Sequence, residues 1–327
     1  IIELLGGCRW LTVLVTSRVR LRLSGEHEVP VPPLALQATA SPYGGADIAQ
    51  APAVQLFVAR AQDARADFAL TNINAPDVAE ICRRLDGLPL ALELAAARCK
   101  ILPPAALLAR LDPRLPLLTG GAQDLPERQQ TLRGTIAWSH DLLREEERIL
   151  FRRLGVFAGG WTLQAAEAVA NGEGGLDVFE ELTLLVDKSL VRVAENVDDE
   201  PRFTMLETIR EFALECLAGD LDEAQAMRRA HAQYFADHAI TAWDDLTVGV
   251  PRAVRWVRAE EANLRTTLAY LLEANDVETS LRLVNSMSDY WIASGGQFTE
   301  ARSWLDRALG QGANATPAAQ AWALCGL

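Results

Sequence analysis

The chain has 327 residues, of which 50% are hydrophobic, and a formal net charge of −13. This length suits two or three domains, and the hydrophobic fraction excludes a wholly disordered chain. The acidic balance disfavours a broad nucleic-acid-binding surface, because phosphate binding depends on clustered lysine and arginine side chains.

The cysteine pattern indicates a reduced, cytoplasmic protein. No Cys-x-x-Cys occurs and no secretory signal is visible. No apolar run approaches the roughly 18 residues of a membrane span, so we expect no membrane association. Because the chain begins at Ile1 rather than methionine, we interpret it as an internal fragment of a longer protein.

Residues 11–15 form a short, continuous apolar run rich in β-branched side chains. Such a run predicts a buried strand of a parallel sheet. Thr16 and Arg18 follow at its carboxyl end, which is where open α/β sheets place ligands. The sequence therefore predicts the last part of an α/β core in residues 1–40.

Two helices with a sharp join are predicted next, after a helix over 46–62. Asn74 can cap a helix that runs to Leu85, with apolar residues at helical spacing. Gly87 ends that helix, where a left-handed residue is usual, and Pro89 suits the first turn of the next helix, to about Cys99. We call this helix–Gly–x–Pro–helix join the elbow.

From Thr131 the pattern changes to helices followed by a β-hairpin, which is the element order of a winged helix. Asp177 and Glu180 form a capping-box signature before an apolar helix that reaches Asp187. Alternating residues over 190–204 predict the hairpin. The other predicted helices cover 131–143, 145–154, 162–170 and 206–217.

From about Met227 onward the chain reads as paired helices with short, glycine-containing joins. Residues 281–295 and 297–312 predict one helix–turn–helix unit, and 317–327 predict the start of another. Units of this kind bury their apolar faces only by stacking on neighbours. The pattern is similar to tetratricopeptide repeats.

Three stretches in this order resemble the STAND class of signalling NTPases, the NB-ARC-like proteins: "LVTSR" (14–18), "GLPLAL" (87–92) and "FTMLETIREFALE" (203–215). Two further stretches look like its bacterial transcriptional-regulator branch, with antibiotic-regulatory or large LuxR-type architecture: "NLRTTLAYLLE" (263–273) and "ARSWLDRAL" (301–309). The resemblance covers nearly the whole chain.

The resemblance implies a nucleotide site. Arg18 takes the role of the family's sensor of the terminal phosphate, beside Thr16, and Pro89, next to Gly87, takes the contact with adenine. A permanently charged fork suits phosphate oxygens, and a rigid apolar ring suits a base face. Leu206 stands where the family has a histidine on the β-phosphate. Leucine cannot donate a hydrogen bond, so that role is not carried over.

The phosphate loop G-x-x-x-x-G-K-[ST] and the acidic, magnesium-binding strand are missing from the sequence. These elements supply most phosphate recognition and the chemistry. ATP or ADP with Mg²⁺ is therefore expected in the complete parent, a slow ATPase switch. This chain alone is expected to bind ADP more weakly than about 1 mM and not to hydrolyse ATP.

Several other patterns are interpreted as structural. Ser139, His140 and Asp141 are adjacent on a helix and point about 100° apart, so they cannot converge as a catalytic triad. His231 and His238 are too far apart along a helix to chelate a metal. The glutamates at 145–147 begin a helix and are expected to form a solvated face. We predict no catalytic residue and no metal site.

The predicted architecture is mainly α-helical. It comprises the end of a P-loop α/β core (1–40), a helical lid (41–124), a winged helix (125–218) and incomplete tetratricopeptide-like repeats (219–327). ADP would hold these parts closed, whereas ATP and a ligand on the repeats would open and oligomerise them. Protein or ligand partners are expected on the repeats.

The sequence is compatible with three functions. The first is a fragment of a nucleotide-switched regulator of transcription, whose winged helix is an internal lever. The second is a helical-repeat adaptor or scaffold with a decayed nucleotide site. The third is a DNA-binding winged-helix module, which the acidic helix at 177–187 disfavours, so that DNA is expected only on other domains of the parent.

Overall fold

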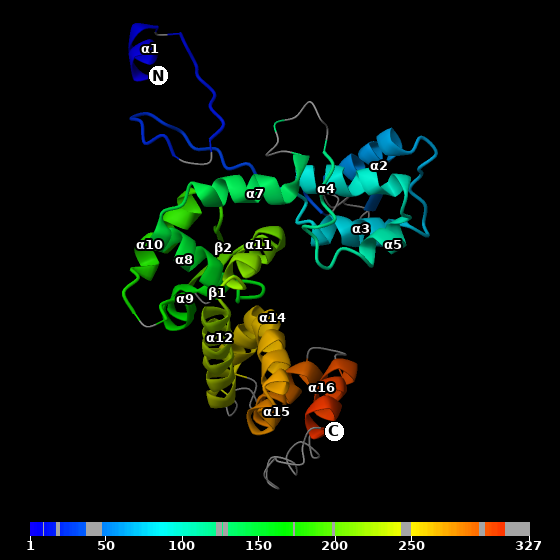
Figure 1. Cartoon of the computed structure of the whole chain (residues 1–327), viewed down its shortest axis with the longest axis vertical. Coiled ribbons are helices and arrows are strands. Elements are labelled where there is room, and N and C mark those ends of the chain that lie inside the picture. The colour runs from blue at the N-terminus through cyan, green and yellow to red at the C-terminus, as the bar shows by residue number, and fades with distance from the viewer. Residues whose placement is uncertain are drawn as a thin grey trace. The chain divides into compact units, whose positions relative to one another are not determined.

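A computed structural model of the chain describes residues 1–8, 10–17, 20–36, 48–121, 126, 130–172, 174–197, 200–242, 250–293 and 298–310. The described residues are mainly helical, as predicted (Figure 1). They divide into two compact units. Unit 1 comprises 1–144, 184–190 and 206–212, and unit 2 comprises 145–183, 191–205 and 213–327.

Unit 1 is a small helical assembly built around the elbow. In it α2 packs on α3 and α4, and α3 packs on α5. Fully buried leucines and aromatics such as Phe57, Leu92 and Leu107 form its core. Its helices are α1 (Ile2–Gly7), η1 (Ile48–Gln50), α2 (Pro52–Ala64), α3 (Ala75–Arg84), α4 (Pro89–Ala97), η2 (Arg98–Lys100), α5 (Pro104–Leu108) and α7 (Leu132–Asp141).

The strand predicted over residues 11–15 is not formed in the structure. These residues have no regular secondary structure and their side chains are exposed, with Leu14 93% exposed. A lone strand leaves its backbone groups unpaired, and all three described strands lie in the winged helix. Residues 11–15 have the composition of a strand, but without a neighbouring strand they form no regular structure and their side chains remain exposed.

Two details of the predicted lid helices are also wrong. The first helix begins at Pro52 rather than at residue 46, with the short 3-10 turn η1 before it. Asn74 precedes α3 but its side chain does not cap the helix. Its Oδ1 instead accepts a hydrogen bond from the backbone N–H of Thr71 at 2.8 Å. The side-chain oxygen of Asn74 is thus used within the turn before α3 and does not cap the helix.

The winged-helix prediction is confirmed, and the structure adds a short third strand. The elements are α8 (Glu145–Leu154), β1 (Trp161–Thr162), α9 (Leu163–Ala170), α10 (Val178–Asp187), β2 (Arg192–Val197), β3 (Glu200–Thr204) and α11 (Glu207–Leu217). The antiparallel sheet has the order β1-β3-β2, with Trp161 opposite Phe203. The predicted cap of α10 is present, because Asp177 Oδ1 accepts from the N–H of Glu180 at 3.0 Å.

After the winged helix, the described part of unit 2 contains four long helices, in agreement with the helical repeats predicted from the sequence. They are α12 (Leu221–Thr241), α14 (Pro251–Glu273), α15 (Val277–Ala293) and α16 (Phe298–Gly310). Each packs on the next, and α12 also packs on α9 of the winged helix (Figure 1). The helix predicted at 317–327 lies outside the described residues.

Candidate regulatory site

The elbow is fixed by a close backbone approach that only glycine permits. Gly87 has φ +63°, and a Cβ at this position would lie 2.3 Å from the carbonyl oxygen of Leu34. The N–H of Leu34 also donates to the carbonyl of Gly87 at 3.0 Å. Gly87 therefore ends α3 as predicted and holds Leu34 against the elbow.

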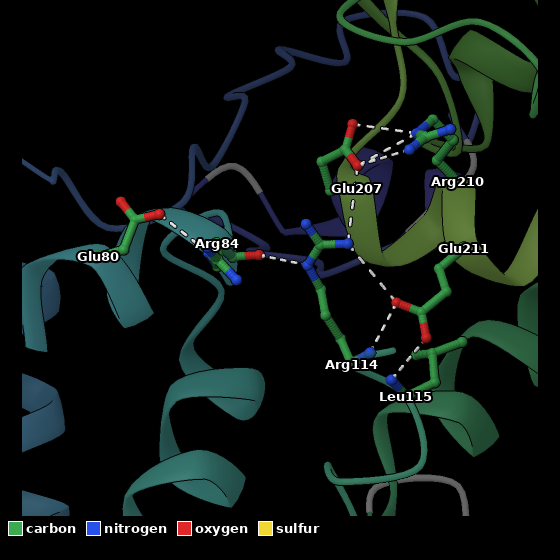
Figure 2. Close-up of polar contacts among 7 residues, drawn as sticks. All are labelled: Glu80, Arg84, Arg114, Leu115, Glu207, Arg210 and Glu211. Atoms are coloured by element: carbon green, nitrogen blue, oxygen red, sulfur yellow. Dashed lines mark hydrogen bonds and ion pairs between the residues drawn. The ribbon is translucent and has the colours of Figure 1, made fainter. Parts of the chain in front are cut away.

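A polar junction joins the elbow to the first turns of α11. The Glu211 carboxylate accepts hydrogen bonds from the backbone N–H groups of Arg114, at 3.0 Å, and of Leu115, at 2.9 Å (Figure 2). The Nε of Arg114 donates to the carbonyl of Arg84, in the last turn of α3, at 3.0 Å. Arg114 thus satisfies a helix-terminal carbonyl while its backbone holds α11.

Charged groups around Arg114 complete the junction. Its guanidinium lies 3.8 Å from the Glu207 carboxylate and 3.7 Å from that of Glu211. Glu207 is also hydrogen-bonded by Arg210, one turn along α11, at 3.1 Å (Figure 2). The guanidinium groups of Arg114 and Arg210 thus both face the Glu207 carboxylate.

Asp86 lies beside this junction, near Glu207, Thr208 and Arg114, and immediately before Gly87. Its backbone is left-handed, with φ +55°, and its buried Oδ2 has no hydrogen-bond partner among the described residues. Burial and the Glu207 charge raise the pKa of Asp86 to about 6. The backbone N–H groups of Thr208 and Glu207 and the Arg114 guanidinium act in the opposite direction but do not outweigh them.

The predicted site residues are only partly brought together. Pro89 is exposed at the start of α4, and Gly87 is buried two residues before it. Leu206 precedes α11, beside Glu207, and its carbonyl accepts from the N–H of Arg210. Thr16 lies on the exposed segment without regular structure, and Arg18 lies outside the described residues.

Sequence reasoning missed Asp86, Arg114 and Glu211. The Asp-Gly pair before the proline was a usable signal, because aspartate is tolerated in left-handed turns. Nothing in the sequence joins Arg114 to Glu211, because 97 positions separate them and neither belongs to a recognisable motif. Only the folded chain brings these two together.

A second polar cluster is buried in unit 2, between the winged helix and α14. Arg202 of β3 forms an ion pair with Glu260 of α14, whose side chain is only 2% exposed. Asn263 accepts from the N–H of Ala158 at 2.7 Å and donates to the carbonyl of Gly160 at 2.8 Å and to Glu260 at 2.7 Å. This polar core ties β3 and the loop before β1 to the repeat helices.

His231 completes the polar core. Its Nε2 lies 3.1 Å from Oδ1 of Asn263. Because an amide oxygen only accepts, this assignment places a proton on Nε2. The ring also packs edge-on against Phe157. The other histidine of this pair, His238, is exposed and stacks near Trp256, so the two rings lie in different surroundings.

The structure corrects the prediction that the glutamates at 145–147 form a solvated face, and it gives Ser139 a structural hydrogen bond. Glu147 is fully buried rather than solvated, because it shares the helical face of Leu150, Phe151 and Leu154, which all point into the core. Ser139 Oγ donates to the carbonyl of Thr135 on its own helix. In the described part of the chain, no group of three His, Cys, Asp or Glu side chains is arranged to hold a metal ion.

The start of α10, the helix between α9 and the β-hairpin, exposes acidic side chains. On α10 the exposed side chains include Phe179, which is 60% exposed, and Glu180, with Asp177 just before the helix. At the other end, Asp187 forms ion pairs with Arg20 at 3.5 Å and Arg22 at 3.3 Å within unit 1. Arginines of the chain itself thus occupy that end of α10.

The comparisons with known proteins agree with this fold. A family model described as a winged helix-turn-helix domain matches residues 143–218. The chain is 40% identical, over 311 residues, to a Mycobacterium tuberculosis protein whose name describes a candidate HTH-type transcriptional regulator. That match covers 94% of this chain and 33% of the relative, and a Mycobacterium bovis protein of the same description gives the same values.

A further Mycobacterium tuberculosis protein, named as uncharacterized, is 43% identical over 234 residues, or 70% of this chain and 56% of that protein. The chain spans about a third of the length of the first relatives. It carries a winged helix-turn-helix domain, and nearly all of it resembles part of proteins named as transcriptional regulators. None of the described helices is both long and apolar enough to cross a membrane.

Proposed function

We propose that this chain is the switching portion of a nucleotide-controlled transcriptional regulator of the STAND type. Its parts would be the end of an α/β nucleotide-binding core (1–40), a helical lid (41–124), a winged helix (125–218) and tetratricopeptide-like repeats (219–327). The polar junction carries the proposal, because it ties the elbow next to Pro89 to α11, the last helix of the winged helix.

One feature of this chain supports the proposed nucleotide site, namely the position of Pro89. Pro89 is an exposed, rigid ring at the first turn of α4, and this suits a base face. The phosphates would need a glycine-rich loop with its lysine, which the sequence does not contain. ATP or ADP with Mg²⁺ would therefore bind the complete parent, with Arg18, Thr16, Gly87 and Pro89 at the site.

In this proposal the winged helix is a lever and not the reader of DNA. DNA binding depends on Lys and Arg side chains that contact phosphates, whereas the exposed side chains at the start of α10 are Phe179 and Glu180, with Asp177 just before the helix. The pairing of Asp187 with Arg20 and Arg22 gives the end of α10 a role inside the protein.

The repeats would be the sensor or protein-interaction region. The pair α15 and α16 extends from Val277 to Gly310, which is a span of 34 residues and equals the period of tetratricopeptide repeats. Stacked pairs of this kind present extended concave surfaces to partners. A ligand or protein bound there would favour opening and self-association of the parent.

Direct DNA binding is the second candidate, because the family model that matches 143–218 describes a winged helix-turn-helix and the named relatives are HTH-type regulators. It predicts that the chain binds duplex DNA with an affinity that falls steeply as salt rises. The lever predicts no such binding. A titration of labelled duplex with the chain at two salt concentrations separates the two.

The test of the nucleotide switch compares two proline variants of the full-length parent. Pro89→Ala removes part of the proposed base contact and should weaken ADP binding by about 4- to 15-fold in calorimetry, since each of the two ring carbons lost contributes up to about 0.8 kcal/mol when covered. Pro52→Ala is the matched control, because Pro52 is also an exposed proline at the start of a helix.

Two results would overturn the proposal. One is a full-length parent that does not bind ADP, which would favour the adaptor with a decayed site. The other is equal ADP affinity in the Pro89→Ala and Pro52→Ala variants, which would remove Pro89 from the site.

A further inference from the structure

We propose that Asp86, Arg114 and Glu211 form a latch that holds the elbow against α11, and that the charge on Asp86 sets how readily this latch opens. The inference rests on the proposed function, because it assigns a means of regulation to the same site. The three residues come from three separate segments: the elbow, the loop after α5, and α11.

Glu211 and Arg114 are the holding part of the latch. One carboxylate of α11 accepts two consecutive backbone N–H groups, at 3.0 and 2.9 Å. Hydrogen bonds to a charged acceptor are stronger than neutral ones. Arg114 extends the connection to the carbonyl of Arg84, so α3, the loop and α11 are joined through two side chains.

Asp86 is the weak point of the latch. Its Oδ2 is buried without a hydrogen-bond partner among the described residues, and the negative charge of Glu207 opposes its own. The positive charges that face it are Arg114 and, on its own segment, Arg83. In the closed latch, hydrogen bonds and positive charges therefore only partly offset the cost of burying a charged Asp86 carboxylate. Opening would expose this carboxylate to water and remove that cost.

The sign of the effect follows from the direction of the pKa shift. The closed latch holds the pKa of Asp86 at about 6, above its ordinary value of 3.8. The closed state therefore binds the proton more tightly than an open state in water. Stabilisation by the protonated group is complete below pH 3.8 and is lost as the pH rises through about 6.

The test is hydrogen exchange of the amides of 207–211 in the whole 327-residue chain without nucleotide, expressed as protection factors. In the wild type, protection should fall about tenfold between pH 5 and pH 7.5. Asp86→Asn keeps the shape without the charge, and asparagine tolerates the left-handed backbone. Asp86→Asn should abolish the pH dependence of protection at 207–211. It should also raise the protection factors at pH 7.5 at least tenfold, because the variant lacks the charge that destabilises the closed latch at that pH.

Two further variants make the result specific. Asp220→Asn is the control for the same substitution elsewhere, because Asp220 caps α12, where it accepts from the N–H of Glu223. It should leave the exchange of 207–211 unchanged. Glu211→Gln should lower protection at both pH values without altering the pH dependence, because it weakens the holding part alone.

The proposal is overturned if wild-type protection of 207–211 does not depend on pH, or if Asp86→Asn retains the wild-type dependence. Either result would leave the nucleotide switch standing, because no nucleotide enters this measurement. Conversely, a parent that ignores ADP would leave the latch itself intact.

Discussion

The two polar clusters of this protein are built in opposite ways. In the polar core of unit 2, every hydrogen-bonding atom of the Asn263 side chain has a partner, and the Arg202–Glu260 pair is almost completely buried. In the polar junction of unit 1, Arg114 is 18% exposed and Asp86 has a buried oxygen without a partner among the described residues.

The difference separates a fixed connection from an adjustable one. A fully satisfied buried network resists any change, because removing one member leaves the others unpaired in a medium of low dielectric. In a partly satisfied network the closed and open arrangements differ less in free energy. A small change in charge or position can then shift the equilibrium between them. We infer that the winged-helix sheet and α14 move as one body, and that change is concentrated at the elbow.

The largest expected effect breaks the polar core. Glu260→Ala leaves Arg202 buried without its partner and should lower the free energy of unfolding by about 3–5 kcal/mol. Glu261→Ala, one residue along, removes only the partly exposed pair with Arg265 and should cost about 0–1 kcal/mol. Urea unfolding of both variants measures the contrast, and equal losses would contradict a special role for the polar core.

A smaller effect is expected at the elbow. Gly87→Ala forces a Cβ against the Leu34 carbonyl and should destabilise the chain by about 2–4 kcal/mol, from left-handed strain and displaced backbone. Gly120→Ala is the control, because Gly120 is also left-handed but its Cβ would meet only the Arg98 side chain, at 3.8 Å. It should cost about 1 kcal/mol. Similar melting temperatures for the two variants would show that the Leu34 contact does not constrain the elbow.

The smallest effect concerns the rim of the junction, at Glu80 (Figure 2). Hydrogen bonding by Arg83 is the main cause that lowers the pKa of Glu80 to about 2. The pair therefore contributes stability above pH 4.5, which is lost as the pH falls towards 2. Because Glu80 is partly exposed, Glu80→Gln should cost only about 0.5–1 kcal/mol at pH 7, and less at pH 3.

Asp77→Asn, on the same helix, serves as the control for the Glu80 variant. Unfolding free energies of wild type and both variants at pH 7 and pH 3 measure the effect. A Glu80→Gln loss that is equal at both pH values would show that the charge of Glu80 is not the cause.

The sequence predicts the parts of this molecule that depend on local signals. Gly87 and Pro89 define the elbow, and Asp177 starts α10 where expected, because left-handed glycine, first-turn proline and side-chain caps act within a few residues. The apolar periodicity of the winged helix and of the repeat helices was sufficient to locate them as well.

What could not be predicted depends on contacts between distant segments. Residues 11–15 have the composition of a strand, but a strand requires a partner that sequence alone does not supply. Glu147 looks like part of a solvated acidic run, and only the packing of α8 reveals that it is buried. Arg114 and Glu211 become a pair only once the lid and α11 are folded together.

The most direct test of the contrast is brief trypsin digestion of the intact chain at pH 8, with the fragments identified by mass spectrometry. Cleavage after Arg114 requires the polar junction to open, whereas cleavage after Arg202 requires the polar core to open. We expect the cut after Arg114 to come well before the cut after Arg202. Simultaneous cleavage at both, or earlier cleavage after Arg202, would contradict a fixed core and an adjustable elbow.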